Sequence, residues 1–185
     1  RFAERALACG GDYVAGLSPE AALRPFAPHD GAPGVEMAYF NLREGRFRQN
    51  NLHFVRALRM GNRSYVEDMY ENRYQKEIAS QFGLAWRVLR KEWRNLWVLG
   101  CYFAVHLAGV LHRRGHASAS DRVRQWVTLA MIERAASALL RTRFVTVTTE
   151  LGGAAIDVDN EDDLEVVEKM LERWKALQAR LARAA

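Results

Sequence analysis

The chain has 185 residues, of which 49% are hydrophobic and 26% are charged. These values are ordinary for a globular protein with a sizeable core, and they exclude an intrinsically disordered chain. Its two cysteines, Cys9 and Cys101, have neither metal-ligand spacing nor a disulfide-rich pattern, so we expect a reducing, cytoplasmic setting. The sequence begins with Arg1 rather than Met, and we expect it to be a fragment or trimmed form of a longer protein.

The formal net charge of +5 is spread unevenly along the chain. Residues 63–143 carry fourteen Lys and Arg against seven Asp and Glu, which gives +7, and the remainder sums to −2. A solvated helical surface is the simplest interpretation. A non-enzymatic basic helical module that binds nucleic acid or an anionic membrane surface stays open as the alternative.

The first elements alternate between helix and strand. Residues 1–8 resemble the end of a helix that stops at the two glycines of positions 10 and 11, and residues 12–15 form a short apolar strand. Ser18 is then expected to cap a short helix, with Pro19 at its first position. The order helix, strand, helix is typical of a wound α/β sheet.

A β-hairpin is expected after the proline-rich loop at residues 25–33. Apolar strands at residues 35–42 and 47–57 flank a turn at Glu44 and Gly45. The expected hairpin carries a cluster of polar residues between positions 43 and 53. This cluster can recognise a ligand, because Arg binds phosphate or carboxylate bidentately and Asn amides bind hydroxyl groups. An exposed hairpin tip is the alternative. The candidate substrate-binding residues are Arg43, Arg46, Asn50, Asn51 and His53.

Helical spacing replaces the strand pattern from residue 64 onward. One amphipathic helix is expected from Ser64, with Val66, Met69, Tyr70 and Tyr74 on one face, and another over residues 84–99. A nearly apolar segment at residues 95–111 is short for a membrane span and predicts a buried helix instead. One further helix is expected over residues 118–140, beginning at Ser118 or Ser120.

An acidic segment lies between the last predicted strands and the closing helix. After a strand at residues 144–149, residues 152–164 are expected to end a second short strand on Asp157 and Asp159 and to open a helix capped by Asn160. Strand residues two apart share a face, and carboxylates at the carboxyl end of a strand suit Mg²⁺. On spacing alone, a metal site and a simple helix cap are equally good interpretations.

The run Ile-Asp-Val-Asp-Asn-Glu-Asp-Asp-Leu at residues 156–164 resembles the carboxyl-terminal signature of the MobA-like nucleotidyltransferases. In that family the closing strand leads into Val-Asp-Thr-Pro-Glu-Asp-Leu. The resemblance implies an α/β fold with a wound Rossmann-like (GT-A-like) sheet, incomplete at its N-terminus. It also implies a large helical insertion at residues 63–143, between α/β parts at residues 1–62 and 144–185.

The same resemblance implies transfer of a nucleotidyl group from a nucleoside triphosphate to a phosphorylated or hydroxyl acceptor, with release of pyrophosphate. Asp159 would be the catalytic ligand of Mg²⁺, and Asp157 is the second candidate for that ligand. The acceptor would be an anionic or sugar-like small molecule. The family's glycine-rich nucleotide-binding loop and its other metal-binding aspartate are absent from this sequence. The basic helices would cover the acceptor or form a homodimer contact. There is no strong nucleic-acid signal, and a weak membrane-surface contact stays open.

Overall fold

The computed structural model describes residues 1–29, 31–62 and 96–184. In chain order the elements are α1 (Phe2–Ala8), β1 (Tyr13–Pro19), α2 (Glu20–Leu23), the 3₁₀ turn η1 (Arg24–Phe26), β2 (Phe40–Leu42), β3 (Gly45–Val55), η2 (Ala57–Arg59), α5 (Leu96–Arg113), α6 (Ala117–Arg124), α7 (Leu129–Leu140), β4 (Phe144–Thr148), η4 (Gly152–Ala155) and α8 (Glu161–Ala184). The helix predicted from Ser64 lies outside the described residues, and so does the helix predicted over residues 84–99 except for residues 96–99, which belong to α5.

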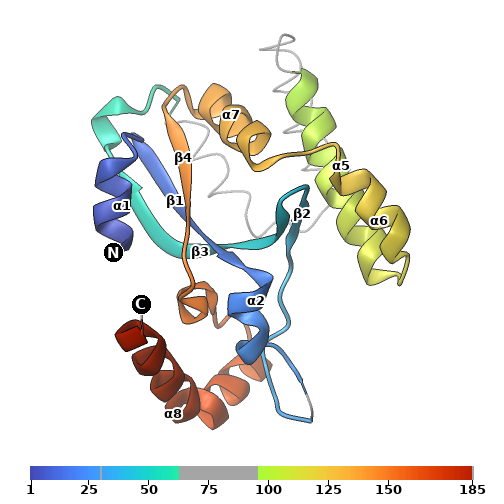
Figure 1. Cartoon of the computed structure of the whole chain (residues 1–185), viewed down its shortest axis with the longest axis vertical. Coiled ribbons are helices and arrows are strands. Elements are labelled where there is room, and N and C mark those ends of the chain that lie inside the picture. Colours follow the sequence, from blue (N-terminus) through green and yellow to red (C-terminus); the bar gives the residue numbers. More distant parts are fainter. Residues whose placement is uncertain (30, 63–95, 185) are drawn as a thin grey trace.

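The described residues form a mixed α/β structure around a curled four-stranded sheet, which confirms the predicted α/β class (Figure 1). The strand order is β2-β3-β1-β4. β1 pairs antiparallel with β3 and parallel with β4, and β2 pairs antiparallel with β3. The segment after α7 therefore returns to the sheet beside the first strand, and the carboxyl ends of β1 and β4 lie at the same edge.

The predicted hairpin is confirmed as β2 and β3, joined by the turn residues Arg43 and Glu44. Its first strand is shorter than expected, because only residues 40–42 pair with β3. β1 is longer than expected and extends through Ser18 and Pro19, which pair with residues 47–48 of β3. The prediction that Ser18 caps a helix is therefore wrong. Its buried hydroxyl accepts a hydrogen bond from Asn50 of β3 instead, and α2 begins after Pro19.

Three apolar clusters hold the helices to the sheet. α1 packs on the sheet through Ala6, α5 packs around the β2–β3 hairpin, and α8 packs against η1 and the segment that follows it. Figure 1 shows α5 and α6 beside β2, and α8 at the end of the sheet away from α7. The buried residues of the three clusters are, respectively, Ala6, Val14 and Val147; Leu17, Leu42, Phe47, Cys101, Val105 and Val127; and Phe26, Val35, Met170 and Trp174.

The single helix predicted over residues 118–140 is two helices. α6 ends before the buried Val127, and the Oγ1 atom of Thr128 accepts a hydrogen bond from the amide of Met131 at 3.2 Å to cap α7. The helix predicted over residues 95–111 is present as α5, but only one of its faces is buried, since Phe103 and Leu107 are exposed. Among the described helices, none is both long and apolar enough to cross a bilayer.

Replacing Trp174 by alanine should destabilise the fold strongly. The indole is only 6% exposed, packs 5.3 Å from the Phe26 ring between centroids, and donates from Nε1 to the Pro25 carbonyl at 3.2 Å. We expect the free energy of unfolding in urea to fall by about 3–5 kcal/mol, as for other buried aromatic truncations.

Trp126→Ala is the matched control, because that indole is 68% exposed. It should change the free energy of unfolding by less than about 0.5 kcal/mol. Equal losses in the two variants would show that α8 does not contribute its apolar face to the cooperative core.

Candidate functional site

The side-chain amide of Asn50 joins three strands at the edge where β1 and β4 end. Asn50 lies on β3 and is 1% exposed. Its Nδ2 atom donates to Ser18 Oγ at 3.0 Å and to Thr149 Oγ1 at 3.1 Å. Its Oδ1 atom accepts from the amide of Leu52 at 3.1 Å. The buried Asn50 amide therefore holds the ends of β1 and β4 against β3. A ligand could reach this amide only if its hydrogen bonds opened.

Gly16 makes room for this amide. A Cβ atom at residue 16 would lie 2.0 Å from Asn50 Oδ1, a distance that real Cβ atoms do not adopt. The pairing of β1 with β3 also changes register between Ala15 and Leu17, so the strand bends around the buried side chain. The local sequence of β1 thus depends on a residue 34 positions away on β3.

The acidic segment is not a strand, contrary to expectation. β4 ends at Thr148, the Thr149 amide donates to Leu17 O at 2.7 Å, and the chain then forms η4. Gly152 packs so closely on α2 that a Cβ atom there would lie 2.0 Å from Ala22 O, which favours this turn over a paired strand. Residues 156–160 follow without regular structure, so the argument that Asp157 and Asp159 share a strand face does not apply.

Asp157 fastens the acidic segment to β3. Its Oδ1 atom accepts from Asn51 Nδ2 at 2.7 Å, and its Oδ2 atom accepts from Arg48 Nη2 at 3.2 Å. Arg48 also donates from Nε to Ala155 O at 3.0 Å. The structure thus brings together two regions that the sequence marked separately, the polar strand and the acidic segment. Both carboxylate oxygens of Asp157 already accept hydrogen bonds.

Asp159 is exposed, and its carboxylate has no hydrogen bond or ion pair within the described part of the chain. The predicted cap beside it is confirmed, because Asn160 Oδ1 accepts from the Asp163 amide at 2.8 Å. Asn160 Nδ2 in turn donates to Asp163 Oδ2 at 2.8 Å. Among the described residues, no group of three His, Cys, Asp or Glu side chains could hold a metal ion. A cation at Asp159 would therefore need oxygen ligands from water or substrate.

The five predicted substrate-binding residues do not gather around one point. Arg43 lies at the hairpin tip and donates from Nε to Gln125 O at 2.8 Å, which ties the tip to the link between α6 and α7. Arg46 forms an ion pair with Glu20. Seven residues of strand separate Arg46 from His53, so these two lie roughly 20 Å apart and cannot both hold one small acceptor.

His53 lies at the far end of β3 from the hairpin turn. Its Nδ1 atom is 3.4 Å from the Tyr13 hydroxyl, and the two rings meet edge to face at 5.8 Å. Partial desolvation lowers the pKa of His53 and raises the pKa of Tyr13. This pair belongs to the junction of β1 and β3. Asn51 alone among the five residues contacts the acidic segment directly.

Sequence reasoning missed Arg48, Ser18 and Thr149 as parts of the site. Arg48 alternates with Arg46 along β3, which places both side chains on one face, and this pattern was the available signal. Ser18 resembled a helix cap, and Thr149 resembled the end of a strand. Only their shared contact with Asn50 reveals what they do.

Asn50→Ala should cost more stability than Asn51→Ala, although the two asparagines are neighbours. The first change leaves two buried hydroxyls and the Leu52 amide without their partner, whereas the second removes one exposed bond to Asp157. We expect a loss of about 1–3 kcal/mol at residue 50 and less than about 1 kcal/mol at residue 51, measured by urea denaturation. Equal losses would contradict a structural role for the buried amide.

No protein-family model matches the chain, and no curated protein matches it. A solved structure described as a hypothetical transferase from Thermus thermophilus is similar, with a TM-score of 0.48 and 20% sequence identity. The similarity covers 88% of this chain and 56% of that one. This chain therefore spans little more than half of the length of that protein.

Proposed function

We propose that this chain is part of a nucleotidyltransferase, which transfers a nucleotidyl group from a nucleoside triphosphate to a phosphorylated or hydroxyl acceptor and releases pyrophosphate. The observation that supports the proposal best is the contact between β3 and the acidic segment through Asp157. It joins the region that carries the MobA-like resemblance to the strand proposed to face the acceptor. The parallel pairing of β1 with β4 is compatible with a wound Rossmann-like sheet.

Asp159 is the better candidate for the metal ligand. Mg²⁺ prefers oxygen ligands, keeps several waters and commonly uses only one or two carboxylates beside substrate phosphates. A single exposed carboxylate without a described partner fits that requirement. Bound Mg²⁺ would supply positive charge for the triphosphate. Asp157 is the weaker candidate, because Asn51 and Arg48 already donate to its two oxygens.

Arg48, Asn51 and Asp157 then act as positioning residues in this proposal. Asp157 holds the segment that presents Asp159, and Arg48 holds both Asp157 and the Ala155 carbonyl. The guanidinium and the amide also add donors beside the acidic segment, where an anionic acceptor would need them. The chain's contribution to the reaction is thus orientation and electrostatic stabilisation rather than covalent chemistry.

Asp159→Asn in the full-length protein should abolish most of the Mg²⁺-dependent release of pyrophosphate. Changes to residues that only support metal ligands cost about 10- to 100-fold, so loss of the ligand itself should cost at least about 100-fold. The assay would follow pyrophosphate with each nucleoside triphosphate and with phosphorylated acceptors, in the presence of Mg²⁺ and after its removal by a chelator.

Asp162→Asn is the matched control, because it removes the same charge from the first turn of α8 at an exposed position. It should leave the rate within about threefold of wild type, since a surface charge at a helix N-terminus contributes little. Full activity of Asp159→Asn, or an equal loss in the Asp162 control, would refute the assignment of the metal ligand.

A further inference from the structure

A cleft of about 350 Å³ lies between the segment that leads into β2, the start of β3 and the last turns of α5. Its polar lining residues are Glu36, Tyr39, Asn41, Arg46, His112 and Arg113. Neither Asp157 nor Asp159 lines it, and Arg46 is its sole contribution from the predicted substrate-binding set. The volume is in the range of sites that bind small metabolites.

Two residues that line this cleft, Asn41 and Arg46, each have a buried polar atom without a partner among the described residues. Asn41 is 3% exposed and donates from Nδ2 to Tyr39 O at 3.1 Å, but its Oδ1 atom is buried without a hydrogen bond among the described residues. Arg46 Nε is likewise buried and unpaired in the described structure. Such atoms are rare in native proteins and need an explanation. One orphan is an acceptor and the other a donor, which is what a ligand with both hydroxyl and anionic groups would satisfy.

Two arginines from different elements, Arg46 of β3 and Arg113 of α5, line the cleft. Arg46 is fixed by its ion pair with Glu20 and lies over the Tyr39 ring, with Cζ 4.6 Å from the centroid. Arg113 is exposed near the end of α5, and no hydrogen bond or ion pair to another described residue holds it. Arginine suits a phosphate group, because a free guanidinium such as that of Arg113 can donate two parallel hydrogen bonds.

The acceptors of the cleft suit hydroxyl groups. Glu36 contributes an exposed carboxylate, and Asn41 contributes an amide whose Oδ1 atom has no partner among the described residues. Glu20 and Glu36 also offset the charge of the two arginines, so a ligand with several phosphate groups would fit poorly. A ligand with one phosphate and several hydroxyls matches the lining in both charge and hydrogen bonding.

Gly109 keeps the cleft open beside α5. A Cβ atom there would lie 3.5 Å from both Asn41 Nδ2 and Arg113 Nη1, which is ordinary van der Waals contact. A methyl group would therefore fit. Alanine would also favour the helical conformation over glycine by about 1 kcal/mol, which is a factor of about five in the equilibrium constant for helix formation. A longer side chain would enter the space between the amide and the guanidinium.

We propose that this cleft binds a small phosphorylated sugar or polyol, with its phosphate at Arg46 and Arg113 and its hydroxyls at Glu36 and Asn41. The proposal does not rest on the nucleotidyltransferase function, since it concerns binding alone. Ribose 5-phosphate and glycerol 3-phosphate are suitable probes, with ribose and inorganic phosphate as the two halves of the ligand.

Isothermal titration calorimetry on the purified chain tests the proposal. Ribose 5-phosphate or glycerol 3-phosphate should bind, and either half alone should bind more weakly. Arg113→Ala should raise the Kd by about 10- to 100-fold, as expected for loss of a charged hydrogen-bonding group. Arg114→Ala is the control, because Arg114 is the exposed neighbour that does not line the cleft, and it should leave the Kd within about threefold.

A second pair of variants tests the space itself. Gly109→Leu should abolish binding, whereas Gly109→Ala should retain it, and circular dichroism would verify that both fold. Asp159→Asn should bind the sugar phosphate like wild type, which separates this site from the proposed metal ligand. The proposal is overturned if neither phosphate ester binds at about 10 mM, a concentration above the weak-affinity range near 1 mM. Equal affinity for inorganic phosphate, or unchanged binding in Arg113→Ala, would also overturn it.

Discussion

The hydrogen bonds of Asn50 hold the carboxyl ends of β1 and β4 together on β3. The amide uses both of its Nδ2 donors, on Ser18 and Thr149, and its Oδ1 atom accepts from the backbone of β3. Gly16 gives the amide room under β1, at the point where the pairing of β1 with β3 changes register between Ala15 and Leu17. Two chain segments leave from this junction, α2 after Ser18 and the acidic segment after Thr149. The position of the candidate site therefore depends on one buried side chain that does not need to contact a ligand.

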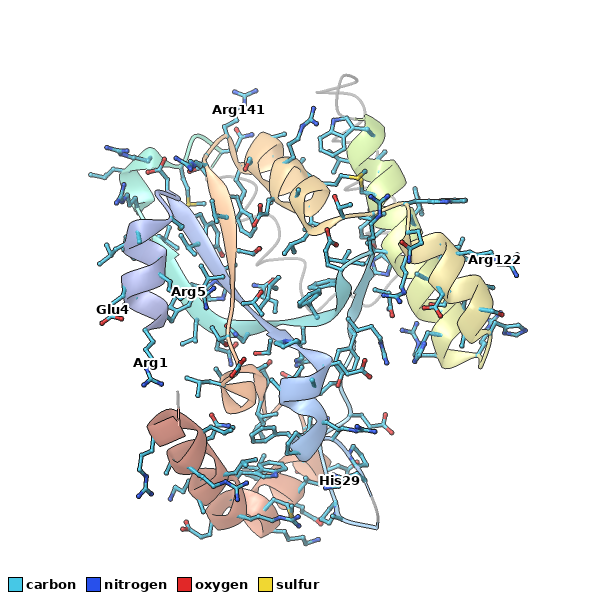
Figure 2. The ribbon with its side chains drawn as sticks, viewed as in Figure 1. Arg1, Glu4, Arg5, His29, Arg122 and Arg141 are labelled. Carbon is cyan, nitrogen blue, oxygen red and sulfur yellow. The ribbon has the colours of Figure 1, made fainter. Side chains whose placement is uncertain are left out.

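The contacts above this junction position the site but add little to stability. Arg48 and Asp157 keep 20% and 39% of their side-chain surface exposed, so their ion pair contributes at most about 1 kcal/mol. Arg5 points from α1 toward β4 and donates from Nη1 to Thr148 O at 2.6 Å (Figure 2). The end of β4 is thus held by Arg5 at Thr148 and by Asn50 at Thr149, so the acidic segment begins from a fixed point.

Features decided by local chemistry could be predicted from the sequence, and features decided by distant contacts could not. The hairpin and the Asn160 cap depend on neighbours within a few residues, and both are confirmed. The strand expected at the acidic segment failed because Gly152 packs against Ala22, far away in the chain. The helix expected from Ser118 to Leu140 broke where Val127 is buried against the hairpin.

The candidate site follows the same division. The residue types of the acidic segment and of β3 indicated polar chemistry at both places. The partner of Asp157 could not be predicted, because Asn51 is 106 positions away in the sequence. The close spacing of the five predicted substrate-binding residues in the sequence also suggested one cluster. An extended strand, however, separates neighbouring residues by about 3.3 Å each. The structure instead divides them between a junction, a hairpin tip and the acidic segment.

Arg46 and Arg48 connect the two regions proposed to bind ligands. They are two residues apart on β3, so their side chains share a face and their Cα atoms are roughly 7 Å apart. Arg46 lines the cleft, and Arg48 holds the acidic segment. Burial raises the pKa of Tyr39, and the charge of Glu20 raises it further. Arg46 and Arg48 both lower it, so the charges of both arginines act on this one phenol. A phosphorylated sugar in the cleft would lie beside Arg46, two residues along β3 from the side chain that holds the acidic segment. The binding of that ligand and the role of Asp159 nevertheless depend on different side chains, and either can fail without the other.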